Sequence, residues 1–113
     1  MHHDSKDLNI ESVKIAFREE RVYYTSHAKT EMENEELGKI NDTELEQAIE
    51  NCRIIEDYPD DKPYPSYLVF GRTLNRRPIH VVFAWNGDED SVIIVTVYEP
   101  DPARWIRFEK RRK

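Results

Sequence analysis

The apolar positions in the N-terminal third of the chain follow helical spacing. Apolar residues at steps of three and four, with charged residues between them, predict an amphipathic helix over residues 6–20. A short aromatic and β-branched run predicts a strand at residues 22–25. Ser26 is a good N-cap for a second helix over residues 27–36, which Gly38 ends by adopting a left-handed conformation.

A third helix follows, and the chain then changes to a β pattern. Residues 42–46 open this helix, and Thr43 and Glu46 have the spacing of a capping box. Residues 52–58 predict a strand. The next segment, residues 59–66, contains three prolines, which remove backbone donors and fix backbone angles, so it predicts a loop.

The C-terminal half predicts three more strands, at residues 67–74, 78–85 and 91–99. They are rich in Val, Ile, Phe and Tyr and are separated by turns of three and five residues, which are ordinary hairpin lengths. The third strand is apolar on both faces, which is typical of a central strand. Beyond it, residues 103–108 predict a short helix or turn that packs through Trp105 and Phe108.

The turn lengths predict a register for these three strands. If the turns close without bulges, Leu74 faces Pro78 and Trp85 faces Ser91, which places His80 opposite Arg72 on one side and Thr96 on the other. One end of the shared face is then polar and is the candidate active or binding site. The shared face comprises Leu68, Phe70, Arg72, His80, Val82, Ala84, Val92, Ile94, Thr96 and Tyr98.

This order of elements predicts an α+β fold. We expect two or three N-terminal helices packed on a four- to five-stranded, mainly antiparallel sheet. A chain of 113 residues fits one domain, so we expect a single domain over residues 1–113.

Charge is distributed unevenly along the chain. The net charge is -6, but the last ten positions hold six of the seventeen basic residues and only one acid. The remaining 103 residues therefore carry eleven basic and twenty-two acidic residues, a net charge of -11. A basic tail over residues 106–113 attracts phosphate. We expect either a nucleic-acid contact that includes Arg104 and Arg107, or a solvated terminus that aids solubility.

The remaining composition bears on location and cofactors. The single Cys52 cannot form an internal disulfide, and neither a secretion leader nor a long apolar run is present, so we expect a cytoplasmic protein without a membrane span. Cys52 is interpreted as a small buried residue, with a reactive thiol as the alternative. A metal site of His27, His80 and a carboxylate lacks compact ligand spacing, so we expect no metal or other cofactor.

The candidate residues match the needs of RNA cleavage without a metal. Such cleavage requires a base for the 2'-hydroxyl, a cation for the phosphate and an acid for the leaving oxygen. His80 supplies the base or acid, Arg72 matches phosphate geometry, and Tyr98 donates a hydrogen bond or a proton. Thr96 orients His80, and Tyr64 stacks on a base.

Another candidate, His27, lies at the start of the second helix, where the helix dipole favours an anion. The same residues also have structural interpretations. His80 can be a hydrogen-bonded packing residue, Arg72 can pair with Glu99 or Asp101, and His27 can tie its helix to the sheet. Tyr64 can pack its loop onto the body of the domain.

Several motifs together resemble a known family. They are residues 26–28, 54–61, 65–66, 71–72, 78–82 and 95–101, with Trp105. On these motifs the chain is similar, over roughly residues 23–105, to the bacterial and archaeal family called domain of unknown function 4258. The resemblance implies a RelE-like fold, a relation to the RelE/ParE and BrnT toxin superfamily, and a partner antitoxin with a YgiT-type zinc finger.

One departure accompanies this resemblance. Members commonly carry arginines in the helix after the His-Ala pair, whereas this chain has Glu31 and Glu35. The resemblance implies a type II toxin-like, metal-independent endoribonuclease, whereas acids in place of phosphate-binding bases argue against that activity in this chain. The alternative is a non-catalytic protein-interaction module of the same fold, inactive as a nuclease, and a homodimer is compatible with either function.

Overall fold

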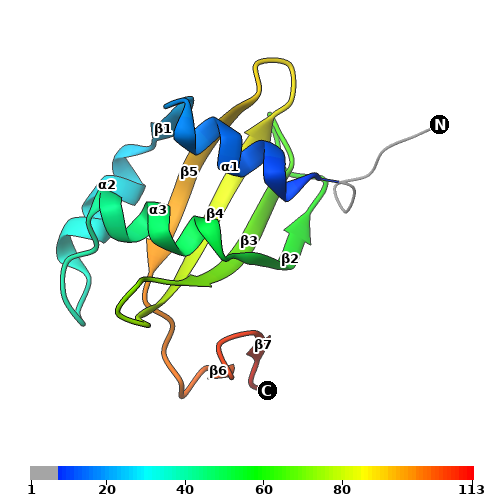
Figure 1. Ribbon diagram of the computed structural model, residues 1–113. Coiled ribbons are helices and arrows are strands. Elements are labelled where there is room, and N and C mark those ends of the chain that lie inside the picture. The colour runs from blue at the N-terminus through cyan, green and yellow to red at the C-terminus, as the bar shows by residue number, and fades with distance from the viewer. Residues whose placement is uncertain (1–7) are drawn as a thin grey trace.

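Three helices and two sheets form the part of the chain, residues 8–113, that this computed structural model describes (Figure 1). The predicted α+β class is confirmed. The helices are α1 (Ile10–Arg18), α2 (Ser26–Asn34) and α3 (Asp42–Glu50). The strands are β1 (Val22–Tyr24), β2 (Arg53–Tyr58), β3 (Ser66–Arg72), β4 (Pro78–Asn86), β5 (Ser91–Tyr98), β6 (Trp105–Ile106) and β7 (Lys110–Arg111).

The larger sheet is mainly antiparallel, as predicted, with one parallel pairing. Its strand order is β1-β5-β4-β3-β2, and β2 to β5 form an antiparallel meander. The first strand of the chain joins the far edge, where it runs parallel to β5 with Val22 opposite Val92. β5 therefore lies inside the sheet along the length of β1, as its apolar sequence predicts.

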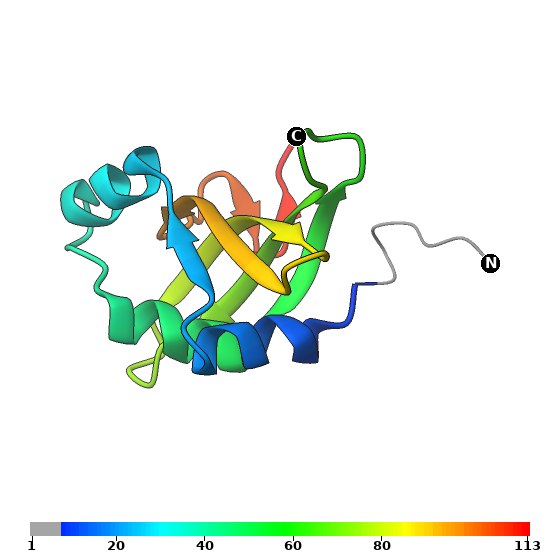
Figure 2. The ribbon, with the colours of Figure 1, turned by 90° about the horizontal axis from the view of Figure 1, so that it is seen from above.

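The two faces of this sheet are covered differently. Helices α1 and α3 pack on one face, α2 lies along the β5 edge, and the β6–β7 hairpin lies on the opposite face (Figure 2). Contact between α3 and β3 is so close that a Cβ on Gly71 would lie 1.9 Å from the carbonyl oxygen of Ala48. The core between helices and sheet includes Val13, Ala16, Leu45, Ile49, Val69, Ile79, Val81, Phe83, Val92, Ile94 and Val97.

The predicted register between β3 and β4 is wrong by two residues. Arg72 pairs with Pro78, and Phe70 rather than Arg72 is opposite His80. The turn spans residues 73–77, because Thr73 exchanges backbone hydrogen bonds across it and its hydroxyl also accepts from the Arg77 amide at 3.1 Å. A shift of two residues preserves which side chains share a face, so Phe70 and His80 remain on the same side.

The predicted register between β4 and β5 is also wrong, because β5 contains a bulge. His80 pairs with Tyr98 rather than Thr96, whereas Phe83 pairs with Ile94. One extra residue on β5 moves Ile94 and Val92 to the helix-covered face, where both are fully buried. The apolar side chains at this end of β5 therefore fill the main core, whereas the predicted face had placed them beside His80.

The helix caps differ from the predicted ones by a few residues. The first helix begins after Asn9, whose side chain accepts from the Glu11 amide at 2.9 Å; the start predicted at residue 6 lies outside the described residues. Thr25, rather than Ser26, caps α2 by accepting from the Ala28 amide at 3.0 Å. In each case the residue with a suitably placed oxygen outside the first turn acts as the cap.

The connection from α2 to α3 also corrects two expectations. Helix α2 ends at Asn34, so Gly38, with a φ of 114°, lies in the connection rather than at the helix end. The capping box of α3 is formed by Asn41 and Glu44, rather than by the Thr43 and Glu46 pair. The helix starts at Asp42, the first residue of the predicted opening segment, so only the capping pair differs.

Glu31 of α2 and Glu35, the C-cap residue of the same helix, complete the β5 edge where β1 no longer covers it. The side chain of Glu31 accepts from the Val97 amide at 3.0 Å, and that of Glu35 accepts from the Glu99 amide at 3.0 Å. A step of four residues along a helix and a step of two along a strand are both roughly 6 to 7 Å, so the two spacings match. Glu31 and Glu35 therefore satisfy edge donors of the sheet.

The C-terminal segment contains the turns predicted within residues 103–108, but they flank a strand of a hairpin and no helix forms there. Strands β6 and β7 pair, with Trp105 opposite Arg111. The predicted packing through Trp105 is confirmed, because its side chain is only 4% exposed. Part of the expected basic tail is thus a folded element that covers the sheet.

Candidate functional site

His80 lies beneath this hairpin and is fully buried. Its Nε2 lies 2.6 Å from the carbonyl oxygen of Phe108, and its Nδ1 lies 3.0 Å from the hydroxyl of Tyr98. A carbonyl only accepts, so Nε2 carries the proton and Nδ1 accepts the hydrogen bond that the Tyr98 hydroxyl donates. The imidazole is therefore held in one neutral form with both nitrogens occupied.

Burial controls the acid–base properties of this pair. Removal from water lowers the pKa of the His80 imidazole below its ordinary value, and the hydrogen bond to the Phe108 carbonyl only partly offsets this effect. Burial also raises the pKa of Tyr98 to about 12. Tyr98 therefore remains a protonated donor, and His80 a neutral acceptor, at neutral pH.

Aromatic rings surround the imidazole. The ring centroids of Trp105, Tyr98 and Phe70 lie 4.5, 5.2 and 5.8 Å from that of His80, all in edge-to-face arrangements. These contacts come from β3, β5 and the hairpin, and they fix the plane of the ring.

Arg72 lies beside this cluster but not opposite His80. Its guanidinium carbon stands 5.3 Å from the ring centroid of Phe70 and 5.6 Å from that of Phe108, and it donates to the carbonyl of Arg76 at 3.0 Å. Among residues 8–113 it has no carboxylate partner, so the alternative of a pair with Glu99 or Asp101 is wrong. Arg77 binds Glu99 instead, at 2.6 Å.

A carboxylate and a second guanidinium, neither predicted from the sequence, complete the cluster. Arg111 donates to both oxygens of Glu56, at 2.8 and 3.1 Å, and the hydroxyl of Tyr58 donates to the same carboxylate. Burial acts to raise the pKa of Glu56, but these hydrogen bonds outweigh it and hold the pKa below its ordinary value. The β pattern of residues 53–58 predicts the strand that carries Glu56. No feature of the sequence predicts that Arg111 lies next to this strand.

A groove of about 350 Å³ opens next to the cluster. Tyr98 is partly exposed in this groove. Arg104, which was predicted to contact nucleic acid, lines the groove together with Arg111. The other charged residues of the groove are acidic, so its charge is mixed. The lining residues are Glu36, Tyr98, Glu99, Asp101, Arg104, Trp105 and Arg111.

The structure does not bring the remaining predicted residues to His80. His27 is exposed on α2 and faces Glu31 at 3.3 Å. Thr96 pairs with Val82, two positions along the strand from His80. Tyr64 accepts from the side chain of Asn86 at the opposite end of β4.

The outer side of the hairpin carries an exposed basic surface. Within residues 8–113, five of its cations have no carboxylate partner. Arg107, a predicted contact for substrate, belongs to this surface and lies in the tight turn of the hairpin with a φ of 54°. The basic surface consists of Arg104, Arg107, Lys110, Arg112 and Lys113.

The chain matches the family described as Domain of unknown function (DUF4258) over residues 24–99. That segment is more than half of the 113 residues. The chain belongs to the DUF4258 family. No curated protein and no solved structure matches it.

The family match includes the cluster residues that belong to the large sheet, but not those that belong to the hairpin. In this DUF4258 protein, Glu56, His80 and Tyr98 lie inside the matched segment, whereas Trp105 and Arg111 lie beyond it. The hairpin that covers His80 is therefore outside the matched part of the chain. The resemblance seen in the sequence is confirmed at the level of the family.

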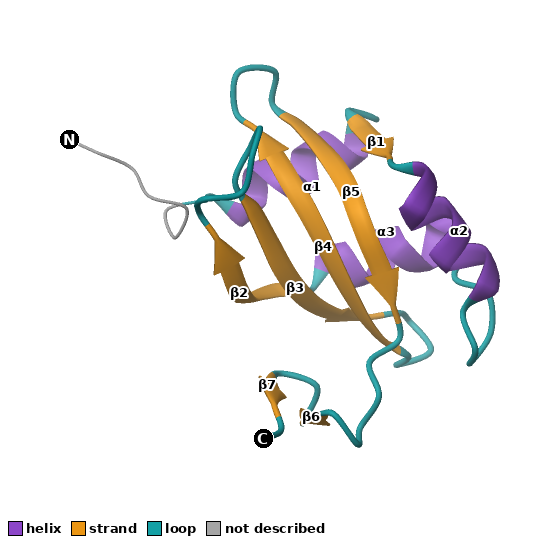
Figure 3. Ribbon diagram, turned by 180° about the vertical axis from the view of Figure 1, so that it is seen from behind, coloured by secondary structure: helices purple, strands orange, loops and turns teal. Residues whose placement is uncertain are grey.

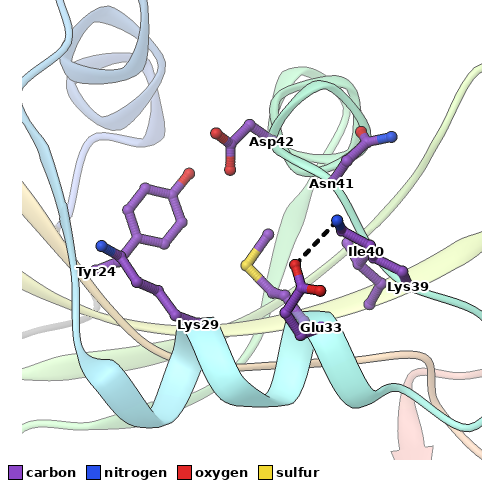
Figure 4. Close-up of a pocket in the computed structure, with 8 residues that line it drawn as sticks. Tyr24, Lys29, Glu33, Lys39, Ile40, Asn41 and Asp42 are labelled. Carbon is purple, nitrogen blue, oxygen red and sulfur yellow. Dashed lines mark ion pairs between the residues drawn. The ribbon is translucent and has the colours of Figure 1, made fainter.

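A second cavity, of about 570 Å³, lies between β1, α2 and the start of α3 (Figure 4). Met32 and Ile40 are its buried apolar residues, and Lys39 pairs with Glu33 at 2.9 Å on its rim. Two lysines and two carboxylates line it, so its charges balance. The lining residues are Tyr24, Lys29, Met32, Glu33, Lys39, Ile40, Asn41 and Asp42.

Other chemistry in the described part of the chain is limited. No group of three or more His, Cys, Asp or Glu side chains within residues 8–113 could hold a metal ion. Over the same residues no helix has the length and apolar character needed to cross a membrane. Cys52 is half-buried, and burial raises the pKa of its thiol to about 11, which disfavours the reactive thiolate.

Proposed function

We propose that this DUF4258 protein is a toxin-like, metal-independent endoribonuclease of the RelE/ParE and BrnT kind. One observation carries the proposal: an imidazole, a phenol and two guanidinium groups gather on one face of the sheet, with His80 and Tyr98 in direct contact at 3.0 Å. The exposed basic surface of the hairpin supports an RNA substrate, because phosphates bind unpaired Lys and Arg side chains.

The proposed reaction uses these groups in distinct roles. With the hairpin displaced, Nε2 is released from the Phe108 carbonyl and the neutral imidazole carries its proton on Nδ1, next to Tyr98. The free Nε2 then removes the proton of the 2'-hydroxyl, whose oxygen attacks phosphorus, and Tyr98 protonates the 5'-oxygen as its bond to phosphorus breaks. Arg72 and Arg111 hold the phosphate oxygens. The proton on His80 then returns to the Tyr98 phenolate through their hydrogen bond, which restores both groups.

Access to His80 requires the hairpin to move, because the imidazole is fully buried. The hairpin strands contain two residues each, and Arg111 and Glu109 attach them to the sheet through ion pairs with Glu56 and Arg53. RNA phosphates compete with Glu56 for Arg111 of the hairpin, and with Glu109 of the hairpin for Arg53. In this proposal, RNA binding and exposure of His80 are therefore coupled.

Cleavage assays test the proposal. Purified protein is incubated with RNA in the presence of a chelator, and growth is followed after induced expression. We expect cleavage and growth arrest, each lost in Tyr98→Phe and His80→Gln, with a fall in rate of roughly 100-fold or more. Tyr23→Phe is the matched control, because Tyr23 is 58% exposed and lies outside the cluster. RNA that stays intact with folded wild-type protein would falsify the ribonuclease function.

A second function, the non-catalytic interaction module, is favoured by a separate observation. Both nitrogens of His80 already have protein partners, which is the arrangement of a structural histidine. An antitoxin with a YgiT-type zinc finger is the proposed partner. Co-expression and purification test this function: we expect a stable complex while RNA remains uncut, and the absence of any complex with the co-expressed antitoxin would reject it.

A further inference from the structure

The β6–β7 hairpin is attached to the domain without sharing a sheet with it. Its backbone hydrogen bonds are internal, such as the one from the Arg112 amide to the Arg104 carbonyl at 2.8 Å, or run to the preceding connection, such as the one from the Trp105 amide to the Asp101 carbonyl at 3.2 Å. Within residues 8–113, no main-chain hydrogen bond joins it to the five-stranded sheet. It is therefore a separate unit that can leave the sheet without breaking a strand pairing.

Side-chain contacts and one carbonyl hold the hairpin in place. The Phe108 carbonyl accepts from His80, the ring of Trp105 packs on the imidazole, and Arg111 binds Glu56 through two hydrogen bonds. The last pair is accessible to solvent, with side chains 61% and 26% exposed. The surface of the sheet that binds the hairpin thus has a buried contact at His80 and an exposed ion pair at Glu56.

The segment that connects β5 to the hairpin has features that allow the hairpin to extend away from its own domain. Pro100 and Pro102 restrict the backbone after β5, and Asp101 starts a separate turn by accepting from the Ala103 amide at 2.8 Å. Figure 3 shows this connection running from the end of β5 to the hairpin as a distinct segment.

We propose that a second copy of the chain can supply this hairpin. Residues 104–111 of one copy then dock on the His80 surface of the other, and each copy contributes the Phe108 carbonyl and Arg111 to its neighbour's cluster. The exchange needs no new interface, because the surfaces already fit each other within one chain. It is opposed only by the higher effective concentration of the attached hairpin. This interaction surface follows from the hairpin geometry and is independent of RNA cleavage.

Charge reversal separates exchange between copies from closure within one chain. In Glu56→Arg or Arg111→Glu alone, like charges meet whether the hairpin docks in its own chain or in an identical copy. When the two variants are mixed, reciprocal exchange restores an opposite-charge pair at both surfaces. We expect dimer in the mixture at a level about tenfold above either variant alone, measured by size-exclusion chromatography with light scattering.

Two controls make the result specific. The double variant with both reversals restores the pair within one chain and behaves like wild type. Reversal of Arg18 and Glu50 in separate chains is the matched control, because they form a similar exposed pair between α1 and α3, and mixing them yields no dimer. Circular dichroism verifies folding. A mixture of folded Glu56→Arg and Arg111→Glu that remains monomeric overturns the proposal, as does equal dimer in either variant alone.

Discussion

At the scale of single residues, the state of His80 links structure to pH. Its imidazole is fully buried in a neutral form, and burial lowers its pKa. The titratable or charged groups around it are Tyr98 on β5, Glu56 and Tyr58 on β2, and Arg111 on β7. None of these neighbours titrates between about pH 5 and 6.5, since burial raises the pKa of Tyr98 to about 12 and the pKa of Glu56 is held low.

We therefore predict that the free energy of unfolding falls as the pH falls below about 6.5. The unfolded chain binds a proton at residue 80 in this range, whereas the folded chain resists it, so stability is complete above the unfolded pKa and is lost as pH decreases. The slope is limited to about 1.4 kcal/mol per pH unit for one group. Urea unfolding at several pH values measures it.

His80→Gln provides the comparison for this prediction. It removes the titration while keeping a polar side chain, so we expect a flatter pH dependence from about pH 5 to 6.5. Equal slopes for the variant and wild type would show that another group controls stability in this range.

The sequence predicted part of the site at this scale. His80 and Tyr98 were expected on one face, and they are in contact, because strand alternation survives a register shift of two residues. Glu56 and Arg111 were not predicted as a pair. Their contact depends on the hairpin folding back over the sheet, a tertiary arrangement without a local sequence signal.

At the scale of elements, the crossing of α3 over β3 depends on Gly71. Gly71→Ala would place a methyl group 1.9 Å from the Ala48 carbonyl oxygen, so the helix must shift away from the sheet. We predict that the free energy of unfolding decreases by roughly 3 kcal/mol, measured by urea denaturation.

Gly87→Ala is the matched control for this substitution. Its new methyl group would meet only the Trp85 side chain, at 3.5 Å, which is ordinary van der Waals contact. We expect a change within about 0.5 kcal/mol. If both alanine variants lose the same stability, close packing at Gly71 is not the cause.

A second element-scale prediction concerns the edge of β5. Glu31→Ala removes the acceptor of the Val97 amide and should lower stability by about 1 to 2 kcal/mol. Glu33→Ala, on the same helix, removes only an exposed pair with Lys39 and should change stability by less than about 0.5 kcal/mol. Thermal and urea unfolding compare the two, and similar losses would contradict an edge-capping role for Glu31.

Elements were predicted better than their ends and pairings. The three helices and the meander follow from local periodicity and turn residues. Local patterns did not predict three other features, because each is determined by packing between distant segments. These are the bulge in β5, the parallel pairing of β1 and the β6–β7 hairpin. Val92 and Ile94 illustrate this, since their burial against the helices places them on the face opposite to the predicted one.

At the scale of the whole molecule, charge is separated between a basic hairpin and an acidic body. The basic surface lies on the face of the sheet opposite α1 and α3 (Figure 2). For binding of single-stranded RNA to this surface, we predict that affinity falls steeply with salt. In the double variant Arg107→Gln and Lys110→Gln, the slope of log affinity against log salt should decrease by about 0.7 for each phosphate that the variant no longer neutralises.

Fluorescence anisotropy with a labelled oligonucleotide over a series of salt concentrations measures these slopes. Arg18→Gln is the control, because Arg18 is an exposed arginine on α1 that pairs with Glu50. A slope that is the same in wild type and the double variant would place RNA binding, if observed, elsewhere on the molecule.

The parallel pairing of β1 with β5 also sets an order for folding. The meander closes through short local turns, whereas Thr25 reaches Val95 across 70 residues of sequence. We expect strands β2 to β5 to form the sheet first. Strand β1 and helix α2 then cover the outer edge of β5. Until then the outer edge of β5 is open to strands of other chains. Substitutions that slow the arrival of residues 22–35 should therefore increase aggregation during refolding, even where the native protein loses little stability.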